Sequence, residues 1–516
     1  MATIDELKKV RKQKLKAVQT AGLLPYPAKT KRTHTVKEAL DLFSKIFKSK
    51  KDIILAGRIM AMRGHGGATF LDIQDGSNDP DYPKNILPAK IQGLIKEDRL
   101  GEDGYRFFVD HFDVGDFVEI KGTLLKTKRG EKTIEADDYN MLAKSLTPLP
   151  SEKLWNLGKT EDRRGLKDED EIFRKRYIDI LFNPKVKEMI RQRAIFWQSM
   201  REFLIKKGFL EVETPVLEIT TGGADAKPFV THHNALDLDV YLRISTGELW
   251  QKKLMVAGFE KTFEIGRQFR NEGMDAEHLQ DYTQMEFYWA YADDKMGMKL
   301  VEELYKEVIG KTFGRLKFKI RGFDVDFGAK WEIYDYQTMI NKYARIDIFE
   351  ASLPEMEKAI KRLGIRAEGF SAEGGPASGW NKTRAIDNLW KYCRKNLAGP
   401  GFLINVPIDV SPLAKRDEKN PKIAKKFQII LAGSEMGNGY SELNDPIEQA
   451  ERFTEQQKLR EKGDEEAQMF DAEFVEALEY GMPPTCGFGL SERLFSFLMD
   501  KPMRETQIFP LMRPKQ

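Results

Sequence analysis

The clearest pattern in the chain is a two-residue alternation of apolar and polar positions near its middle. In residues 262–270, Phe263, Ile265 and Phe269 share one face, and polar side chains share the other. Residues 283–289 alternate in the same way. Because successive side chains of a strand point to opposite faces, the two segments are predicted to form an antiparallel hairpin with one apolar and one polar face.

The polar face of this hairpin differs from that of an ordinary exposed sheet. It combines carboxylates, a guanidinium, amides and a phenol rather than repeating lysine, threonine and glutamate. The connection 271–282 is also long for a hairpin, and it contains His278 and several acids. A solvated polar face is the alternative explanation. Long loops on a rigid sheet are commonly functional, so we interpret this face as a candidate site.

A group of short β-like runs precedes the hairpin, from residue 52 to residue 142. The predicted strands are residues 53–62, 68–74, 89–95, 116–127 and 132–138. The last two are joined by Lys-Arg-Gly-Glu, which is a hairpin signature. About five short strands in roughly 90 residues match the size of a small β-barrel such as an OB-fold, although a five-stranded sandwich has the same periodicity.

Changes in the pattern divide the chain into parts. Residues 4–21 are rich in lysine, leucine and glutamate and meet Gly22, which predicts an amphipathic helix with a glycine stop. Residues 186–207 place apolar side chains on one helical face. A proline- and charge-rich stretch after residue 145 indicates a linker. We predict an N-terminal helical segment (1–50), a barrel domain (51–144), a linker (145–185) and a mixed α and β domain (186–516) with a charged helical insertion at about 350–397.

Composition narrows the class of protein. The 516 residues are 32% charged but carry a net charge of only +3, so an RNA partner would have to be bound by local basic patches. Cys393 and Cys486 are far apart, which excludes a disulfide framework and fits a reducing compartment. The charged N-terminus does not resemble a signal peptide, and there is no apolar run of about 18 residues. We therefore expect a cytoplasmic protein without a membrane segment.

The hairpin also carries a known motif. Residues 269–272 read F-R-N-E, the F-R-x-E form of motif 2 in class II aminoacyl-tRNA synthetases, and the continuation DYTQMEFYWAYAD is similar to the lysyl enzymes of that class. Further blocks resemble the same enzymes in the same order: TGGADAKPFVTHHNALDLDVYLRI (221–244), SPLAKR (411–416), EMGNGYSELNDPIEQAERF (435–453) and the tail from GMPPTCGFG onwards. The chain thus resembles bacterial-type class II lysyl-tRNA synthetases over most of its length.

This resemblance implies a fold and an activity. The fold would be α+β, with an N-terminal OB-fold barrel that binds the anticodon and a class II catalytic domain, which is an antiparallel sheet flanked by helices. The lysine carboxylate would attack the α-phosphate of ATP to form lysyl-adenylate, and a terminal ribose hydroxyl of tRNA(Lys) would then take the lysyl group. Positioning and charge neutralisation should dominate, because a carboxylate is already a nucleophile. The implied partners are tRNA(Lys), ATP, L-lysine and a second copy in a homodimer.

The resemblance also assigns the ATP-binding and catalytic residues. The catalytic set is Arg270, Glu272 and Arg493. Arg270 would grip α-phosphate and carboxylate oxygens together, since a guanidinium presents several donors in one plane. Glu272 would accept from the adenine amino group, and Arg493 of motif 3 would bind the γ-phosphate. The full set implied for ATP is Arg270, Glu272, His278, Tyr282, Glu435 and Arg493.

ATP brings magnesium as the expected cofactor. The lysyl enzymes usually hold it with two acids seven residues apart, of which Glu435 is the second. The first position is Gln428 in this chain. Magnesium is satisfied by few carboxylates together with phosphate oxygens and water. We therefore expect a Mg²⁺ site that depends on Glu435, with Glu442 as an additional contact, and fewer ions held by the protein.

The substrate residues implied by the resemblance fall into two groups. The lysine pocket would comprise Gly223, Glu248, Glu286, Tyr288, Asn438, Tyr440 and Glu442. An acid-rich pocket suits a substrate with two ammonium groups, because buried charges must be paired. On the barrel, Arg63, Phe70 and Gln92 match positions that contact the anticodon, where stacking on an aromatic ring is the expected mode.

Three alternatives remain open from the sequence. An aspartyl- or asparaginyl-tRNA synthetase shares the barrel and the catalytic scaffold, but it would need a cation for its substrate side chain. A lysine-transferring paralogue would act on a non-tRNA acceptor. A non-catalytic regulatory protein would retain the fold with a degraded site, an alternative that Gln428 and a motif 3 one residue shorter than usual keep in view.

Overall fold

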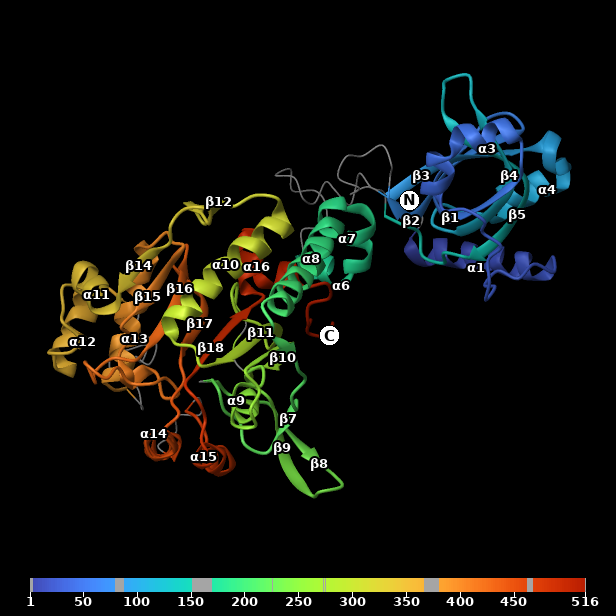
Figure 1. The fold of residues 1–516 in the computed structure, drawn as a ribbon. Helices are drawn as coiled ribbons and strands as arrows, with labels where there is room; N and C mark the ends of the chain where they lie inside the picture. Colours follow the sequence, from blue (N-terminus) through green and yellow to red (C-terminus); the bar gives the residue numbers. More distant parts are fainter. Residues whose placement is uncertain are drawn as a thin grey trace. The chain divides into compact units, whose positions relative to one another are not determined.

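The computed structural model describes residues 3–78, 88–150, 169–224, 226–271, 273, 275–365, 380–461 and 467–515 (Figure 1). The chain divides into two compact units, Met1–Glu188 with Leu511–Gln516 and Met189–Pro510. The boundary between the units falls inside helix α8 (Pro184–Lys206). Within the described ranges, no helix combines the length and the apolar character needed to cross a membrane.

The first unit contains a closed barrel with the strand order β1-β2-β3-β5-β4. Its strands are β1 (Ile53–Gly64), β2 (Ala68–Asn78), β3 (Pro88–Lys96), β4 (Phe117–Lys126) and β5 (Lys132–Ala143). Inward-facing side chains such as Leu71, Ile120 and Ile134 are fully buried. This closure confirms the predicted barrel and excludes a sandwich.

Helices accompany the barrel in this unit. They are α1 (Ile4–Thr20), α2 (Val36–Asp41), α3 (Phe43–Ser49), α4 (Glu97–His111), α6 (Glu169–Arg174) and α7 (Arg176–Phe182). The predicted α1 begins with a capping box at Thr3, and Gly22 follows its end with a φ of 77°. Helix α4 is not among the predicted elements, and Gly101, with a φ of 74° and a ψ of 162°, is non-helical and kinks it. Stacked rings of Phe108 and Phe112, both buried against the barrel core, anchor this segment.

The second unit is built on an eight-stranded sheet with the order β14-β15-β16-β17-β18-β11-β10-β6. Its strands are β6 (Leu210–Glu211), β10 (Lys261–Phe269), β11 (Asp281–Ala290), β14 (Glu332–Asp335), β15 (Gly401–Ile404), β16 (Lys426–Leu431), β17 (Ser434–Ser441) and β18 (Thr485–Ser491). Neighbouring strands run antiparallel except for the pairs β14–β15 and β10–β6. The sheet therefore has the antiparallel character expected of the catalytic domain.

Strands β10 and β11 form the predicted hairpin, with Phe263 opposite Phe287 and Glu264 opposite Glu286. Phe263 and Phe287 are 0% exposed, and the Phe287 ring lies 5.7 Å from that of Phe488 on β18. Glu264 and Glu286, on the other face, are each only 4% exposed. The polar face is therefore enclosed by protein, and a solvated sheet does not explain it.

Helix α10 (Asp294–Phe313) covers the apolar face of the sheet (Figure 1). The buried Tyr305 ring lies 6.4 Å from Phe488, and its hydroxyl donates to the Met436 carbonyl at 2.6 Å. The other elements are β7 (Leu217–Glu218), β8 (Val230–His233), β9 (Leu238–Leu242), α9 (Glu248–Val256), β12 (Lys317–Ile320), β13 (Phe323–Asp326), η2 (Ile408–Val410), α14 (Pro446–Glu461), α15 (Ala472–Glu479), α16 (Arg493–Leu498) and α17 (Met503–Thr506). With one face covered by α10, the opposite face is left to form the site.

A group of helices with its own core lies beside β14 and β15. It contains α11 (Tyr336–Ala344), α12 (Leu353–Arg362), α13 (Lys382–Cys393) and η1 (Arg394–Asn396). The core includes the fully buried Ile340 and Leu389. The predicted insertion at about 350–397 falls here, and its segment 366–379 lies outside the described residues. This group places Trp390 and Arg394 beside the end of the sheet that carries Glu435.

Candidate active site

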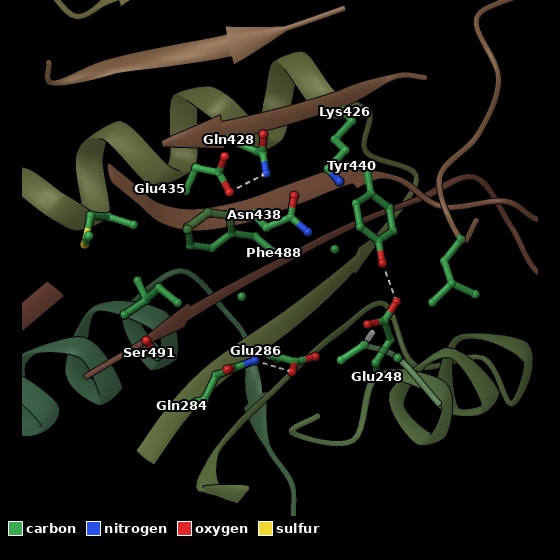
Figure 2. A pocket seen from close by; sticks show the side chains of 18 of the residues that line it. Glu248, Gln284, Glu286, Lys426, Gln428, Glu435, Asn438, Tyr440, Phe488 and Ser491 are labelled. Atoms are coloured by element: carbon green, nitrogen blue, oxygen red, sulfur yellow. Dashed lines mark hydrogen bonds between the residues drawn. The ribbon is translucent and has the colours of Figure 1, made fainter. Parts of the chain in front are cut away.

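A cavity opens on the polar face of the large sheet (Figure 2). Its walls include β11, β16, β17 and β18 and the loop that joins β10 to β11. The cavity brings together the predicted residues Gly223, Glu248, Arg270, His278, Tyr282, Glu286, Tyr288, Glu435, Asn438, Tyr440, Glu442 and Arg493. Glu272, expected to contact adenine, lies outside the described residues. Residues up to 270 positions apart in the chain, such as Gly223 and Arg493, therefore share one site.

Three carboxylates form one end of the cavity. Glu248 is the first residue of α9, Glu286 projects from β11, and Glu442 follows the last residue of β17. They are 5%, 4% and 1% exposed. Because a buried charge requires a partner, an end that gathers three acids is suited to cationic groups.

Hydroxyl and backbone donors hold two of these carboxylates. The Tyr440 hydroxyl donates to Glu248, a contact drawn in Figure 2. Glu286 accepts from the Thr246 backbone N–H at 2.7 Å and from the Tyr288 hydroxyl at 3.0 Å. Such bonds orient the acids before a substrate arrives, which lowers the entropy cost of binding.

Lys252, which was not among the predicted residues, does not line the cavity but contacts two of these acids. Its Nζ lies 2.8 Å from Glu248 Oε1 and 2.6 Å from Glu442 Oε2, and its side chain is 1% exposed. The spacing of four residues from Glu248 on α9 is that of a helical ion pair, which is a signal present in the sequence. Nothing in the sequence indicates that Glu442, 190 positions away, joins the same ammonium.

Burial controls the ionisation of these groups. Burial, with Glu248 nearby, raises the pKa of Glu286 to about 7. Burial likewise raises the pKa of Glu442 to about 8, while Lys252 acts in the opposite direction. For Lys252, burial disfavours the ammonium, but the carboxylates of Glu248 and Glu442 outweigh it and raise its pKa. Glu286 and Glu442 therefore remain partly protonated near neutral pH until further cations approach them.

The opposite end of the cavity carries Arg270, which follows β10. Its Nε donates to the Ile244 carbonyl at 3.3 Å, and its Cζ lies 5.8 Å from the centroid of the Tyr282 ring. His278, in the loop between β10 and β11, has its Nδ1 2.9 Å from Asp275. A guanidinium fixed at a strand end beside an aromatic ring can bind oxyanions with its planar set of donors.

Arg493, at the start of α16, is engaged by an acid that was not predicted. Glu277, in the loop between β10 and β11, forms ion pairs with Arg493 and with Arg321. Burial lowers the pKa of the Arg493 guanidinium to about 10, with Asp275 acting in the opposite direction. A carboxylate thus lies where two arginines could bind a phosphate. The only signal in the sequence was the acidic character of the long loop.

Glu435 is the acid expected to hold magnesium. Its Oε1 accepts from Trp390 Nε1 at 2.6 Å and lies 3.3 Å from Arg394 Nη1. Its Oε2 accepts from Gln428 Nε2 at 3.1 Å (Figure 2). Among the described residues, no three His, Cys, Asp or Glu side chains cluster where they could hold a metal ion together.

The expected contribution of Glu442 to that metal site does not fit this geometry. Glu442 follows β17 and Glu435 is its second residue, so the two lie roughly 23 Å apart along the strand, at about 3.3 Å per residue. Glu442 is instead paired with Lys252. An ion held by Glu435 therefore cannot also be bound by Glu442.

On the barrel, the predicted anticodon residues lie on adjacent strands. Arg63 is opposite Phe70 in the β1–β2 pair, and Gln92 is opposite Asp72 in the β2–β3 pair. Arg63 also forms an ion pair with Asp72 at 2.8 Å. Phe70 is partly exposed while the following Leu71 is fully buried, so Phe70 faces away from the barrel core. The three side chains can therefore belong to one surface.

Comparison with known proteins defines the class. The family model for tRNA synthetases class II (D, K and N) matches residues 168–513, and the model for an OB-fold nucleic acid binding domain matches residues 53–142. The barrel and the large antiparallel sheet with its polar cavity are thus those of a class II aminoacyl-tRNA synthetase.

Sequence identity to individual relatives identifies the family within this class. The chain is 38% identical to the lysine–tRNA ligase of Thermosipho africanus and 39% identical to that of Thermotoga maritima, over 99% of this chain and 97% of each relative. It is 41% identical to the lysine–tRNA ligase of Carboxydothermus hydrogenoformans, over 99% of both chains. The chain belongs to the lysine–tRNA ligase family.

Proposed function

We propose that this protein activates L-lysine with ATP and transfers the lysyl group to tRNA(Lys). The observation that carries the proposal is the separation of charge along one cavity. Buried acids gather at one end and arginines at the other, so an amino acid with two ammonium groups and a carboxylate can lie between them. Full-length similarity to lysine–tRNA ligases supports the same activity.

In the first step, an oxygen of the lysine carboxylate forms a bond to the α-phosphorus of ATP. The bond from that phosphorus to the bridging oxygen of the β-phosphate breaks, and pyrophosphate leaves. Arg270 would hold the carboxylate and the α-phosphate together, and Arg493 would hold the γ-phosphate. Glu272, His278 and Tyr282 complete the proposed ATP set. Oriented reactants and fixed positive charge lower the barrier without a side-chain base.

In the second step, a terminal ribose hydroxyl of the tRNA attacks the carbonyl carbon of lysyl-adenylate. The bond between that carbon and the phosphate oxygen breaks, and AMP leaves. The proposed lysine pocket is Gly223, Glu248, Glu286, Tyr288, Asn438, Tyr440 and Glu442. Gly223 has a φ of 86°, and a Cβ added there would lie 2.5 Å from Ser245 Oγ. Glycine at this position therefore avoids both backbone strain and a collision.

Magnesium fits this site only in part. The residues suit one ion held mainly by ATP phosphates, with Glu435 as its protein carboxylate, because Mg²⁺ commonly binds through one or two carboxylates and substrate oxygens. Such an ion would neutralise phosphate charge. Arg394 and the side-chain amide of Gln428 already contact Glu435, so the described residues do not suit a second ion held by the protein.

We propose that the barrel reads the anticodon through Arg63, Phe70 and Gln92. Support comes from the outward position of Phe70 and from the OB-fold match. We also propose that the chain is divided into residues 1–50, 51–144, 145–185 and 186–516, with the anticodon residues in the second of these parts. Base stacking on Phe70 beside a basic side chain is a common mode of single-strand binding.

A homodimer is part of the proposal. Six large apolar side chains between positions 195 and 219 are each at least 40% exposed: Ile195, Ile205, Leu210, Val216, Leu217 and Ile219. Their exposure supports the proposal, because a second copy that covered them would bury apolar surface. A cytoplasmic, reducing environment is also proposed, and the buried free thiols of Cys393 and Cys486 agree with it.

Amino-acid-dependent pyrophosphate exchange followed by tRNA charging tests the activity. We expect strong exchange with lysine, none with aspartate or asparagine, and charging of tRNA(Lys). Exchange with aspartate but not with lysine would overturn the proposed substrate. Exchange with lysine without tRNA charging would favour a lysine-transferring paralogue, and no exchange would favour a non-catalytic protein.

A further inference from the structure

The ammonium of Lys252 is already seated among the acids that the proposed function assigns to the substrate. It contacts Glu248 on α9 and Glu442 after β17, at 2.8 Å and 2.6 Å. Both carboxylates also line the cavity, whereas Lys252 is behind them and does not. This ammonium therefore touches two proposed substrate-binding groups without itself forming part of the cavity wall.

The surroundings of Lys252 hold it in place. Its Nζ lies 6.0, 5.5 and 5.8 Å from the ring centroids of Tyr288, Tyr440 and Phe474. Aromatic faces attract a cation, most strongly when water is excluded. The ammonium is thus enclosed by carboxylates and rings, and it cannot move out to solvent without leaving Glu248 and Glu442 buried and unpaired.

The number of charges at this end is informative. Three buried carboxylates, from Glu248, Glu286 and Glu442, face one ammonium, that of Lys252. The deficit of two positive charges equals the number of ammonium groups on lysine. Since uncompensated buried charge is unfavourable, these acids can all be ionised together when two more cations enter the pocket.

The contacts of Glu442 indicate that its carboxylate can bind a ligand while it is paired with Lys252. Lys252 Nζ contacts Glu442 Oε2 at 2.6 Å, and Glu442 Oε1 accepts no hydrogen bond within the described part of the chain. A Cβ added to Gly487 would lie 2.1 Å from Glu442 Oε1, so the carboxylate lies directly against β18. Glu442 is therefore fixed between Lys252 and Gly487, and its oxygens remain able to accept bonds from an incoming ammonium.

We propose that Lys252 is a positioning residue of the lysine pocket, whose buried ammonium holds Glu248 and Glu442 in place and sets at two the number of further cations that the pocket accepts. The inference rests on the proposed function and goes beyond it, because it assigns part of the selection of a diamino acid to a side chain that does not line the cavity. Lys252 acts through the two carboxylates and not on the reacting atoms.

Pyrophosphate exchange with Lys252→Met and Lys252→Arg tests this role. Methionine keeps an unbranched chain without the charge, and arginine keeps the charge. We expect Lys252→Met to raise the KM for lysine on the order of tenfold or more. The KM for ATP should change less than about twofold, because Arg270 and Arg493 are untouched, and kcat should fall less than KM rises. Lys252→Arg should recover much of the loss.

The adjacent Lys253 provides a matched control. It lies on the same helix, is partly exposed, and pairs with Glu473 at 3.7 Å, away from the acids of the pocket. Lys253→Met should leave the KM for lysine unchanged. Far-ultraviolet circular dichroism and thermal unfolding, with and without lysine, separate folding from binding. A folded Lys252→Met protein should show a smaller stabilisation by lysine than the wild type.

Three results would overturn the inference. They are an unchanged KM for lysine in folded Lys252→Met, an equal loss in Lys252→Met and Lys252→Arg, or a parallel rise of the KM values for lysine and ATP. If Lys252→Met does not fold, the comparison of Lys252→Arg with Lys253→Met decides, because arginine then has to preserve lysine binding. Absence of lysine-dependent exchange in the wild type would instead refute the proposed function.

Discussion

The side-chain amide of Gln428 donates a hydrogen bond to the carboxylate of Glu435, with 3.1 Å between Nε2 and Oε2. The two residues lie on neighbouring strands, β16 and β17. Position 428 is where the resemblance to lysyl enzymes leads one to expect a second acid. An amide N–H donates to Glu435 where a second carboxylate would instead share a cation with it. The site therefore has one acid fewer for magnesium than that pattern implies.

Gln428→Glu should make activity more dependent on magnesium. The substitution places a second carboxylate beside Glu435, and like charges at this distance need a cation between them. We expect the half-maximal rate of tRNA charging to require a higher free Mg²⁺ concentration, and Mg²⁺ to raise the unfolding temperature more than in the wild type. Gln428→Ala, which removes the bond without adding charge, is the control. Identical magnesium titrations for wild type and Gln428→Glu would refute this view of the site.

Arg270→Ala should reduce kcat for lysine-dependent pyrophosphate exchange by about 10²- to 10³-fold, as expected when a fixed donor to transition-state charge is removed. Arg270→Lys should restore little, because an ammonium cannot reproduce the planar guanidinium beside Tyr282. Circular dichroism would verify the fold of both variants. Full activity of Arg270→Lys would show that charge alone matters at this position.

Glu277→Gln should strengthen ATP binding. Glu277 pairs with Arg493 and Arg321, so a phosphate that binds these arginines has to displace its carboxylate. We expect the KM for ATP to fall roughly three- to tenfold, which corresponds to about 0.6–1.4 kcal/mol. The KM for lysine should stay the same, because Glu277 is remote from the three acids. A higher KM for ATP would instead mean that Glu277 helps to hold the nucleotide.

Lysine binding should strengthen between pH 6 and pH 8. The pKa values of Glu286 and Glu442 are raised to about 7 and about 8, and their ionised forms are the ones that bind ammonium groups. In the ligand-free protein these acids retain protons that the unfolded chain has lost, so their contribution to stability is present at low pH and is lost as pH rises through 7 and 8. Thermal unfolding at pH 6 and at pH 8, with and without lysine, measures the lysine binding and the stability.

Raising the pH is expected to have opposite effects on the stabilisation by lysine and on the stability of the protein without lysine. Lysine should raise the unfolding temperature more at pH 8 than at pH 6, while the ligand-free protein loses stability over the same range. Glu286→Gln should reduce both effects, because it removes one titrating group. A ligand-induced shift that is equal at both pH values would contradict the assignment of these acids to the lysine pocket.

Phe70→Ala should impair tRNA charging without affecting lysine activation. Loss of one stacked base costs about 1–3 kcal/mol, so kcat/KM for tRNA(Lys) should fall roughly five- to 150-fold. Pyrophosphate exchange without tRNA should be unchanged, since the barrel does not form part of the cavity. A tRNA with an altered anticodon should be less sensitive to the substitution than tRNA(Lys). Equal losses with both tRNAs would place Phe70 outside anticodon recognition.

Much of the fold follows from local patterns in the sequence. Alternation in residues 262–270 and 283–289 was sufficient to predict β10 and β11, because the two faces of a strand are set by the order of its residues. Helix α4 was missed, because Gly101 and Gly104 disfavour a helix on their own. The structure agrees with that preference at Gly101, whose backbone is non-helical and kinks α4, while Phe108 in the part that follows packs against the barrel core.

The candidate site also contains residues that the sequence predicts and contacts that it does not. The motif around Arg270 and the acids at Glu248, Glu286 and Glu442 could be identified because each is part of a short segment with its own signature. Sequence alone determined which side chains share a face of one helix or strand. It could not assign Lys252 to Glu442, Glu277 to Arg493 or Trp390 to Glu435. Those pairs join elements far apart in the chain, and only tertiary packing decides which faces meet and which charges become buried together.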